Sequence, residues 1–394
     1  MTQFFTASAR IIITCNKRLS PYLQQEVVEL GFTPVRTFST GVELLGSIND
    51  CITLNLNLRC ASQVLYSIKE FQANGPDDVY KNIHEIAWEK IISPEGYFSV
   101  TSNVDHPSIR TSLFANVRVK DAIVDRMRTK TGSRPDSGPE LDETVVHLFW
   151  REESAELFLD TSGETLAKHG YRKIPGKAPM LEALATSTLL ATKWNRISPF
   201  INPMCGSSTI AIEAALLATD RRPGLFRNNW AFMHIVGYDK GVYENERQGL
   251  FQKIKEVQGL KIFASDISAD AINISKINAA AAGVEHHITF SMGDFALTEV
   301  PEGESGVVFF NPEYGERLGV EAELQETYAR IGDFMKKRCK GYTGYIFTGN
   351  LELAKKIGLK ASRRLEFFTS KIDCRLLEYE LYAGTRDLKF VKGL

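Results

Sequence analysis

The stretch SPFINPMCGSSTIAIEAA, from Ser198 to Ala215, decides the fold of this chain. A short apolar run ends at Asn-Pro, a turn of small residues follows, and an apolar helical segment comes directly after it. Small residues let a ligand approach the backbone, and the free N–H groups at a helix start favour a carboxylate or a phosphate. The stretch predicts a strand, a turn and a helix that form either a ligand site or an ordinary tight connection. It matches neither G-x-G-x-x-G nor a P-loop, because no lysine precedes the Ser/Thr pair.

The alternation of strand and helix continues to the end of the chain. Helical segments separate further strand-like runs, which cover residues 261–266, 287–294, 306–312 and 344–349. Strands that alternate with helices predict right-handed crossovers and a parallel sheet. The last two apolar runs, 366–370 and 374–382, predict a closing antiparallel hairpin. We therefore expect an α/β domain whose ligands bind at the carboxyl ends of the strands.

The first 163 residues show a different pattern, typical of small α+β units. Strand-like runs there cover residues 10–14, 32–38, 41–48, 96–102, 143–150 and 155–162. Apolar spacing predicts helices over 21–31, over 58–71 (LRCASQVLYSIKEF) and over 112–130. The Gly-, Pro- and Lys/Arg-rich stretch 162–179 is interpreted as a linker, and 221–259 as an insertion in the second half.

The composition is that of a globular protein that is not globally basic. The chain has 394 residues, with 47 Lys+Arg against 48 Asp+Glu and a net charge of −1. This balance excludes a uniformly basic nucleic-acid binder but allows local basic patches. The six cysteines are scattered, without C-x-x-C or metal-ligand spacing, so we expect a reducing compartment and no metal. We find no secretory signal and no apolar run of bilayer length, so we expect a cytoplasmic protein without membrane contact.

Two acids follow the second and third predicted strands. Asp266 ends KIFASD, where a carboxylate can accept hydrogen bonds from both hydroxyls of a ribose. Asp294, in MGDF, can bind an adenine amino group, with the aromatic ring of Phe295 beside it. The alternatives are a helix N-cap for Asp266 and a polar loop residue for Asp294.

The fourth strand end is VVFFNPEYGERLG, Val307 to Gly319, where an apolar run stops at Asn311. The exocyclic amine of a nucleobase is a poor nucleophile, because its lone pair is delocalised into the ring. A site that methylates this amine needs acceptors for its hydrogens, which the Asn311 amide oxygen and the Pro312 carbonyl supply. Tyr314 offers a flat face to an extruded base. The alternative is a turn marked by Asn-Pro, but four such strand ends in order favour a site.

These motifs resemble a known family. NPMCGSST is similar to DPMCGSGT, the cofactor motif of class I S-adenosylmethionine-dependent methyltransferases, and NPEY is similar to the (D/N)PPY motif of those that methylate exocyclic amines. VRVKDAIVDRMR, LDTSGETLAKHGYRK and APMLEALA resemble bacterial THUMP-domain RNA methyltransferases, and the likeness runs over nearly the whole chain. The nearest branch makes N2-methylguanosine in large-subunit ribosomal RNA, and its members are often described as N6-adenine-specific DNA methylases. Some members carry a second, fused methyltransferase, which we do not expect in a chain of this length.

The resemblance implies a Rossmann-like class I methyltransferase domain, with a parallel sheet and a terminal antiparallel hairpin, after two α+β modules. The expected boundaries are 1–60 for a ferredoxin-like module, 61–163 for a THUMP RNA-binding domain, 164–190 for a linker and helix, and 191–394 for the methyltransferase domain. It also implies S-adenosylmethionine as the cofactor and no metal.

The resemblance assigns roles to the strand-end residues. The residues expected at the methionine end of the cofactor are Asn202, Pro203, Cys205, Gly206, Ser208 and Thr209. Asp266 with Ile267 would hold the ribose, and Asp294 with Phe295 the adenine. The residues expected to present the target amine are Asn311, Pro312, Glu313 and Tyr314.

Three residues depart from the usual family pattern. Asn202 stands where an acid is common, so it brings no charge to the ammonium of the cofactor. Ser208 replaces a glycine, which has a cost if the position needs a positive φ or a close approach. Glu313 replaces the second proline, and its carboxylate can accept both N1–H and N2–H of guanine, whereas adenine has no N–H at N1.

Two basic segments are candidates for RNA contact. One runs from Arg118 to Arg134, and the other, 167–177, contains Lys173 and Lys177 and no acid. Basic patches suit phosphates, and the alternative is a solvated helix face followed by a basic linker. The candidate RNA-binding residues are Arg118, Lys120, Arg126, Lys168, His169 and Arg172. His169 could instead be a packing residue. Lys120 could instead form only a surface ion pair with Asp121.

The sequence therefore predicts an enzyme that transfers a methyl group from S-adenosylmethionine to N2 of a guanine in large-subunit ribosomal RNA or its precursor. The first alternative is an adenine-N6 methyltransferase on DNA or RNA, since the NPxY motif does not separate the two. The second is a non-catalytic RNA-binding ribosome-assembly factor, because Asn202, Ser208 and Glu313 depart from the family pattern. The sequence indicates no oligomeric state.

Overall fold

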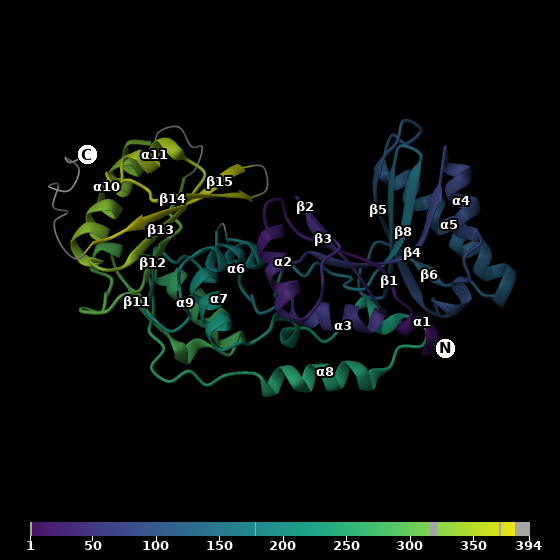
Figure 1. The fold of residues 1–394 in the computed structure, drawn as a ribbon, viewed down its shortest axis with the longest axis horizontal. Helices are drawn as coiled ribbons and strands as arrows, with labels where there is room; N and C mark the ends of the chain where they lie inside the picture. Colours follow the sequence, from purple (N-terminus) through teal and green to yellow (C-terminus); the bar gives the residue numbers. More distant parts are fainter. Residues whose placement is uncertain (1, 178, 315–320, 370–371, 383–394) are drawn as a thin grey trace, which may run out of the picture. The chain divides into compact units, whose positions relative to one another are not determined.

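The chain forms two compact units in the computed structural model, which describes residues 2–177, 179–314, 321–369 and 372–382 (Figure 1). The first unit holds the chain up to His169 together with Arg222–Lys253. The second holds Gly170–Arg221 and the chain from Ile254 onward. Most of the expected insertion at 221–259 therefore folds with the first unit, although it interrupts the sequence of the second. Within the described residues, no helix is both long and apolar enough to cross a membrane.

One sheet organises the described part of the first unit, in the strand order β2-β3-β1-β4-β8-β7-β5-β6. Its strands are β1 (Ala9–Thr14), β2 (Arg36–Phe38), β3 (Gly41–Gly46), β4 (Gln63–Gln72), β5 (Tyr97–Asp105), β6 (Asp136–Ser137), β7 (Thr144–Arg151) and β8 (Ser154–Asp160). Its helices are α1 (Thr2–Thr6), α2 (Ser20–Glu29), α3 (Ile48–Asn57), α4 (Pro76–His84), α5 (Ser112–Thr131) and α8 (Lys240–Gln252), with 3-10 turns η1 (Trp88–Lys90), η2 (Pro223–Phe226) and η3 (Ala231–His234). Helices α4 and α5 pack together, α5 covers β5, and α8 of the inserted segment packs on α3 (Figure 1).

The helix expected over residues 58–71 is wrong, because most of this segment forms strand β4. β4 pairs antiparallel with β1 on one side and with β8 on the other. Val64, Leu65 and Tyr66 are buried in succession, so the strand lacks the alternation of an exposed sheet face. Pairing with strands distant in the sequence overrides the local apolar spacing. This strand joins the two expected α+β modules into one sheet.

The helix that does form in this region, α3, lies before β4. Ser47 caps it: its Oγ accepts the backbone N–H of Asp50 at 3.2 Å, and Asp50 Oδ2 accepts the N–H of Ser47 at 2.7 Å. Such a reciprocal cap stabilises a helix by about 1 kcal/mol. The S-x-x-D signal was present in the sequence, at the end of a run interpreted as a strand.

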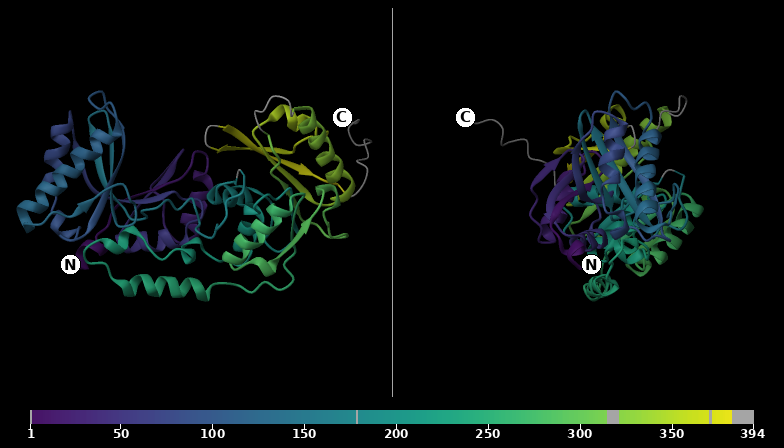
Figure 2. Two further views of the ribbon diagram at one scale, coloured as in Figure 1. Left: turned by 180° about the vertical axis from the view of Figure 1, so that it is seen from behind. Right: turned by 90° about the vertical axis from the view of Figure 1, so that its right-hand side faces the viewer.

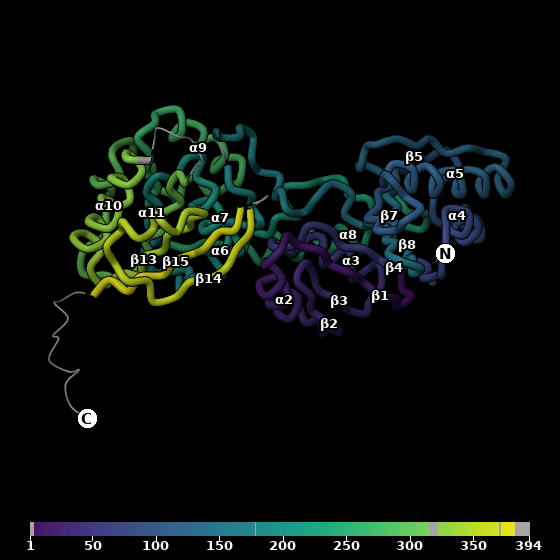
Figure 3. Tube along the Cα trace, turned by 90° about the horizontal axis from the view of Figure 1, so that it is seen from above, coloured from purple at the N-terminus to yellow at the C-terminus, as the bar shows by residue number. Residues whose placement is uncertain are grey.

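The sheet of the second unit has the strand order β11-β10-β9-β12-β13-β15-β14 among the described residues. Its strands are β9 (Phe200–Pro203), β10 (Ile262–Asp266), β11 (Ile288–Met292), β12 (Val307–Phe310), β13 (Thr343–Thr348), β14 (Arg363–Thr369) and β15 (Ile372–Glu380). Its helices are α6 (Glu182–Ala191), α7 (Thr209–Ala218), α9 (Ala269–Ala281), α10 (Glu321–Arg338) and α11 (Leu351–Lys355), with 3-10 turns η4 (Glu285–His287) and η5 (Phe295–Leu297). Neighbouring strands from β11 to β13 in this order pair in parallel. Strand β15 lies between β13 and β14 and pairs antiparallel with both (Figure 3). The expected parallel sheet and closing hairpin are confirmed.

The strand order reverses between β9 and β12, which pair directly. After β9 the chain adds strands on one side, and from β12 it adds them on the other. Such a topological switch leaves a crevice beyond the carboxyl ends of the strands. Behind the sheet, α10 buries Tyr328, Ile331 and Phe334 against strand residues, and each side chain of this size contributes about 2 kcal/mol.

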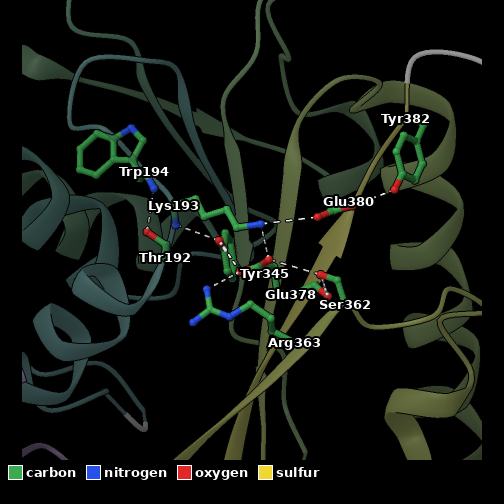
Figure 4. Close-up of polar contacts among 9 residues, drawn as sticks. All are labelled: Thr192, Lys193, Trp194, Tyr345, Ser362, Arg363, Glu378, Glu380 and Tyr382. Carbon is green, nitrogen blue, oxygen red and sulfur yellow. Dashed lines mark hydrogen bonds and ion pairs between the residues drawn. The ribbon is translucent and has the colours of Figure 1, made fainter. Parts of the chain in front are cut away.

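The closing hairpin of β14 and β15 appears in yellow in Figure 2. Glu378 on β15 anchors it (Figure 4). Its side chain is fully buried and meets Lys193 Nζ at 2.8 Å and Arg363 Nη1 at 3.1 Å. Tyr345 Oη donates to its Oε2 at 3.0 Å. Burial opposes ionisation of Glu378, but the hydrogen bonds from Lys193 and Tyr345 outweigh it and lower the pKa of the carboxyl. The hairpin is therefore held by a buried, ionised carboxylate.

Candidate active site

A pocket of about 430 Å³ lies in the second unit, where the chain leaves β9, β10, β11 and β12. Residues from all four predicted strand ends line it, namely Asn202, Cys205, Gly206, Thr209, Asp266, Ile267, Asp294, Phe295, Asn311 and Glu313. Pro203, Ser208 and Pro312 are buried next to these residues in the chain. The crevice at the switch point thus brings together side chains that are separated by more than a hundred positions in the sequence.

The loop between β9 and α7 has an unusual backbone. Met204, Gly206 and Ser208 have φ values of 55°, 56° and 57°, so alternate residues are left-handed. Three N–H groups of this loop are already bonded within the protein: Cys205 donates to the Ser265 carbonyl, Gly206 to Asp266 and Ser208 to the Cys205 carbonyl. Helix α7 begins at Thr209, and the N–H groups of a first helical turn have no partner within the helix. The start of α7 is therefore the part of this site that is suited to a carboxylate.

Ser208 meets the condition under which the sequence predicted a cost, because its φ is positive and its side chain is buried. Its Oγ lies 2.8 Å from Ser275 Oγ on α9. Ser275 is also buried and donates to the carbonyl oxygen of Gly206 at 2.9 Å. These contacts link both ends of the loop to α9.

Asp266 closes the other side of the loop. Its Oδ2 accepts the N–H of Gly206 at 2.9 Å, and its Oδ1 accepts the N–H of Ser268 at 2.9 Å. The N-cap of α9 is Ser268, so the alternative that Asp266 caps this helix is wrong. Ile267 lines the pocket and is 75% exposed, which leaves an apolar face open to a ligand ring.

Asp294 is held by a residue that the sequence analysis missed. Its Oδ1 accepts the N–H of Ala296 at 2.9 Å, and its Oδ2 pairs with Arg330 Nη2 of α10 at 2.6 Å. The hydrogen bond from Arg330 lowers the pKa of Asp294. The Arg330 guanidinium also lies 4.9 Å from the ring centroid of Phe295, whose ring is otherwise packed in the core. No local motif marks Arg330, since only the fold brings α10 to this loop.

Asn202 places a buried oxygen at the pocket. Its side chain is 1% exposed, and its Nδ2 donates to the carbonyl oxygen of Phe309 at 2.9 Å. Among the described residues, its Oδ1 has no hydrogen-bond partner. A buried acceptor without a partner is costly, so a ligand that brings a donor to this atom would be favoured.

The segment Asn311–Tyr314 reaches the same pocket through two of its side chains, Asn311 and Glu313. Glu313 is exposed, and the phenol of Tyr314 lies 4.0 Å from Cys374 Sγ. The Tyr314 ring meets Phe347 edge-on, at 6.5 Å between centroids. Burial raises the pKa of Tyr314, so its phenol stays neutral. The rest of the quoted motif, residues 315–319, lies outside the described residues.

The candidate RNA-binding residues have varied surroundings. Arg126 makes two contacts with Glu89, at 2.7 and 3.1 Å, and Arg172 contacts Glu182 and the carbonyl oxygen of Met180. His169 is 2% exposed, and its Nε2 lies 2.9 Å from the carbonyl oxygen of Arg59. This burial agrees with the alternative that His169 is a packing residue. These side chains serve contacts within the protein, and RNA contact through them stays a prediction.

The other three basic candidates are in the first unit. Lys168 is exposed. Lys120 Nζ lies 3.9 Å from Asp121, the surface pair considered above. Arg118 pairs with Asp77 at 2.6 Å and lies 4.9 Å from the ring centroid of Tyr80. The exposed Lys168 and the loosely paired Lys120 are available to phosphates, whereas Arg118 would have to exchange its ion pair with Asp77.

One metal-ligand grouping was not visible in the sequence spacing. Glu256, His286 and His287 place three ligand atoms within 4.8 Å of one another, away from the pocket. Glu256 is distant in the chain from the two histidines, so only the fold brings them together.

The strand order, the closing hairpin and the pocket at the switch point define a class I methyltransferase fold. The chain belongs to the family described as "RMKL-like, methyltransferase domain", whose model matches residues 169–378. A "RlmL ferredoxin-like domain" matches residues 10–65, and a THUMP domain matches residues 73–160. The expected fold class and family are confirmed, and the domain boundaries proposed from the sequence stay predictions.

Several relatives match nearly the whole chain. "Ribosomal RNA large subunit methyltransferase K/L" of Syntrophotalea carbinolica is 34% identical to this chain. The match covers 95% of this chain but 54% of the length of that relative. A Synechocystis protein named "Putative RNA methyltransferase" is 31% identical over 97% of this chain and 99% of its own length. A solved structure from Listeria monocytogenes, described as a predicted N6-adenine-specific DNA methylase, has 30% identity and a TM-score of 0.85, covering 95% of this chain and 97% of its own. The chain thus spans about half the length of the K/L relatives.

Proposed function

We propose that this protein is an RNA methyltransferase that uses S-adenosylmethionine to methylate the exocyclic N2 of a guanine in large-subunit ribosomal RNA. The observation that carries the proposal is that Asn311 and Glu313 line one pocket together with Asn202, Gly206 and Asp294. One cavity therefore combines groups for the cofactor with groups for a base amine. Family membership and the ribosomal relatives support RNA as the substrate.

The pocket fits S-adenosylmethionine in its chemistry. The unpartnered Asn202 Oδ1 suits the ammonium, and the N–H groups at the start of α7 suit the carboxylate. Asp266 has acceptors for the ribose hydroxyls, and Asp294 has an acceptor for the adenine amine. When bound, the cofactor supplies an electrophilic methyl group on its sulfonium.

The chain's own residues prepare the target amine. Asn311 Oδ1 and the Pro312 carbonyl accept the amine hydrogens, which keeps the nitrogen lone pair directed at the methyl group. The ring of Tyr314 supports the base, and Glu313 accepts its ring N–H. Holding the two groups in line accounts for most of the rate enhancement of such a transfer.

The first unit captures the RNA in this proposal. Arg118 and Lys120 lie on α5 within the segment matched as a THUMP domain, and Lys168 follows that segment in the same unit. Contacts of this type to phosphates position an RNA without reading its sequence. The base choice is made in the pocket of the second unit.

An adenine-N6 methyltransferase remains the second candidate, favoured by the description of the Listeria structure. A non-catalytic assembly factor is the third, and calorimetry with the cofactor separates it from the other two, since it requires no measurable affinity.

The deciding experiment is nucleoside mass spectrometry on ribosomal RNA from cells that lack this protein. The purified protein with S-adenosylmethionine is then added to that RNA. We expect N2-methylguanosine to be lost in the deletion and restored in vitro. Restored N6-methyladenosine would establish the second candidate, and no change in either nucleoside would contradict the proposed activity.

A further inference from the structure

A segment outside the methyltransferase motifs forms part of the pocket wall. We call this segment the strap: residues 172–177 together with Pro179 and Met180. The pocket is lined by Gly176, Lys177, Pro179 and Met180 of the strap. The sequence alone predicts a linker up to residue 179, and Lys177 belongs to the basic segment 167–177 that was considered for RNA contact.

The strap is fixed at both ends within the second unit. The buried Asn278 side chain on α9 accepts the N–H groups of Lys173 and Ile174 at 2.9 and 3.1 Å and donates to the Ile174 carbonyl at 3.0 Å. At the other end, the Met180 carbonyl accepts a hydrogen bond from Arg172 Nη2 at 2.7 Å. Arg172 Nε also donates to Glu182 Oε1 at 3.1 Å. A segment with this many polar contacts is a built part of the site.

The strap also approaches the 204–208 loop closely. A side chain at Gly176 would put its Cβ 3.2 Å from Ser207 Cβ, so glycine permits the contact. Helix α9 fixes both walls, since Asn278 holds the strap and Ser275 holds the 204–208 loop. Lys177 therefore lines the pocket directly after the residue at which the strap meets the loop that leads into α7.

The charges of the pocket single out Lys177. The lining residues include two cations, Lys177 and Arg330, and Arg330 is paired with Asp294. Among the described residues, no carboxylate lies within ion-pair distance of Lys177, which is exposed. The pocket thus holds a cation without an ion-pair partner, and its lining also includes Thr209 and Ile210 at the start of α7.

We propose that Lys177 is a cofactor-binding residue that pairs with the carboxylate of the methionine part of S-adenosylmethionine. The inference rests on the proposed function and adds a subsite to it. The N–H groups at the start of α7 orient that carboxylate, and Lys177 supplies the charge. Asn202 cannot neutralise the ammonium, so a cation at the carboxylate contributes more of the affinity for the amino-acid end.

The test compares two ligands by calorimetry on the full chain. S-Adenosylhomocysteine carries the amino-acid end, and 5′-methylthioadenosine has the same thioether nucleoside without it. For Lys177→Ala we expect about tenfold weaker binding of S-adenosylhomocysteine and unchanged binding of methylthioadenosine, whereas Lys177→Arg keeps most of the affinity. Lys173→Ala is the matched control, because Lys173 contributes its backbone N–H to the strap and its exposed side chain does not line the pocket.

The outcomes separate the two proposals. Unchanged S-adenosylhomocysteine affinity in Lys177→Ala, or an equal loss for both ligands, overturns the role of Lys177 and leaves the proposed function intact. If Lys177→Ala weakens the binding of RNA but of neither small ligand, Lys177 contacts RNA phosphates, and the inference is also overturned. If the wild-type protein binds neither ligand, the proposed function and this inference fail together.

Discussion

Ser208 Oγ lies 2.8 Å from Ser275 Oγ, which joins a left-handed residue in the 204–208 loop to helix α9. A left-handed non-glycine residue costs roughly 1 kcal/mol, and a buried hydrogen bond returns about the same amount. The pair therefore offsets the strain at a position where related motifs have glycine. Ser275 passes the restraint on to the Gly206 carbonyl.

Ser208→Ala is predicted to be more harmful than Ser208→Gly. Alanine keeps the strain and loses the hydrogen bond, which lowers the free energy of unfolding by about 1 kcal/mol, whereas glycine relieves the strain and stays close to wild type. Thermal unfolding of the ligand-free protein measures this difference. Equal melting temperatures for the two variants would mean that φ at Ser208 carries no strain.

Asn311→Ala is predicted to abolish most methyl transfer while keeping the cofactor. The amide oxygen accepts an amine hydrogen only when the base is present, so its loss affects the chemical step, with a decrease of roughly a hundredfold in kcat. Single-turnover methylation of ribosomal RNA measures the rate, and calorimetry with S-adenosylhomocysteine measures the affinity. A comparable loss of cofactor affinity would contradict a role confined to the target amine.

Glu313→Gln is predicted to reduce guanine methylation. The charged acceptor for the ring N1–H is lost, and charge-assisted hydrogen bonds are about twice as strong as neutral ones, so we expect about a tenfold decrease in kcat/KM. Glu323→Gln is the control, because Glu323 is exposed on α10 and does not line the pocket. Guanine methylation at the wild-type rate in Glu313→Gln would refute the proposed base preference.

Arg330→Ala is predicted to weaken binding at the adenine end. Without Arg330, the Asp294 carboxylate loses the partner that orients it, and its lowered pKa rises toward the ordinary value. We expect roughly fivefold weaker binding of both S-adenosylhomocysteine and methylthioadenosine. This differs from Lys177→Ala, which affects only the ligand with an amino-acid end. Tighter binding of methylthioadenosine would mean that Arg330 competes with adenine for Asp294.

Glu378→Gln is predicted to destabilise the hairpin in a pH-dependent manner. The pKa of Glu378 is lower in the folded state, so its stabilisation is present above the ordinary value of 4.5 and is lost as pH falls through the lowered pKa. At neutral pH we expect a loss of about 2 kcal/mol, because a buried charged hydrogen-bonding partner is removed. Thermal unfolding between pH 3 and pH 7 measures the difference in stability between the wild type and the variant. We expect this difference to become smaller at the acidic end of the range.

Glu380→Gln is the control for this prediction. Glu380 is half exposed and meets Lys193 at 3.5 Å, so its removal has a much smaller effect. A Glu378→Gln variant that unfolds at the same temperature as Glu380→Gln throughout this pH range would show that burial of Glu378 does not matter for stability.

The first half of the chain shows where local pattern and fold disagree. The apolar spacing of residues 58–71 predicted a helix, but β4 forms because β1 and β8 pair with both of its edges. The inserted segment likewise packs on α3, where Glu246 Oε1 accepts from Asn57 Nδ2 at 3.2 Å. Partners this far apart in sequence leave no local signal in either segment.

The sequence by itself determined the parallel α/β fold of the second half and the four strand ends that line the pocket. It could do so because strands that alternate with helices run in one direction, which gathers their carboxyl ends at one edge of the sheet. Only the tertiary structure decided that Arg330 holds Asp294, that Ser275 supports Ser208, and that Lys177 lines the pocket. These contacts join elements from different parts of the chain, and their positions depend on how the helices pack on the sheet, which local spacing does not encode.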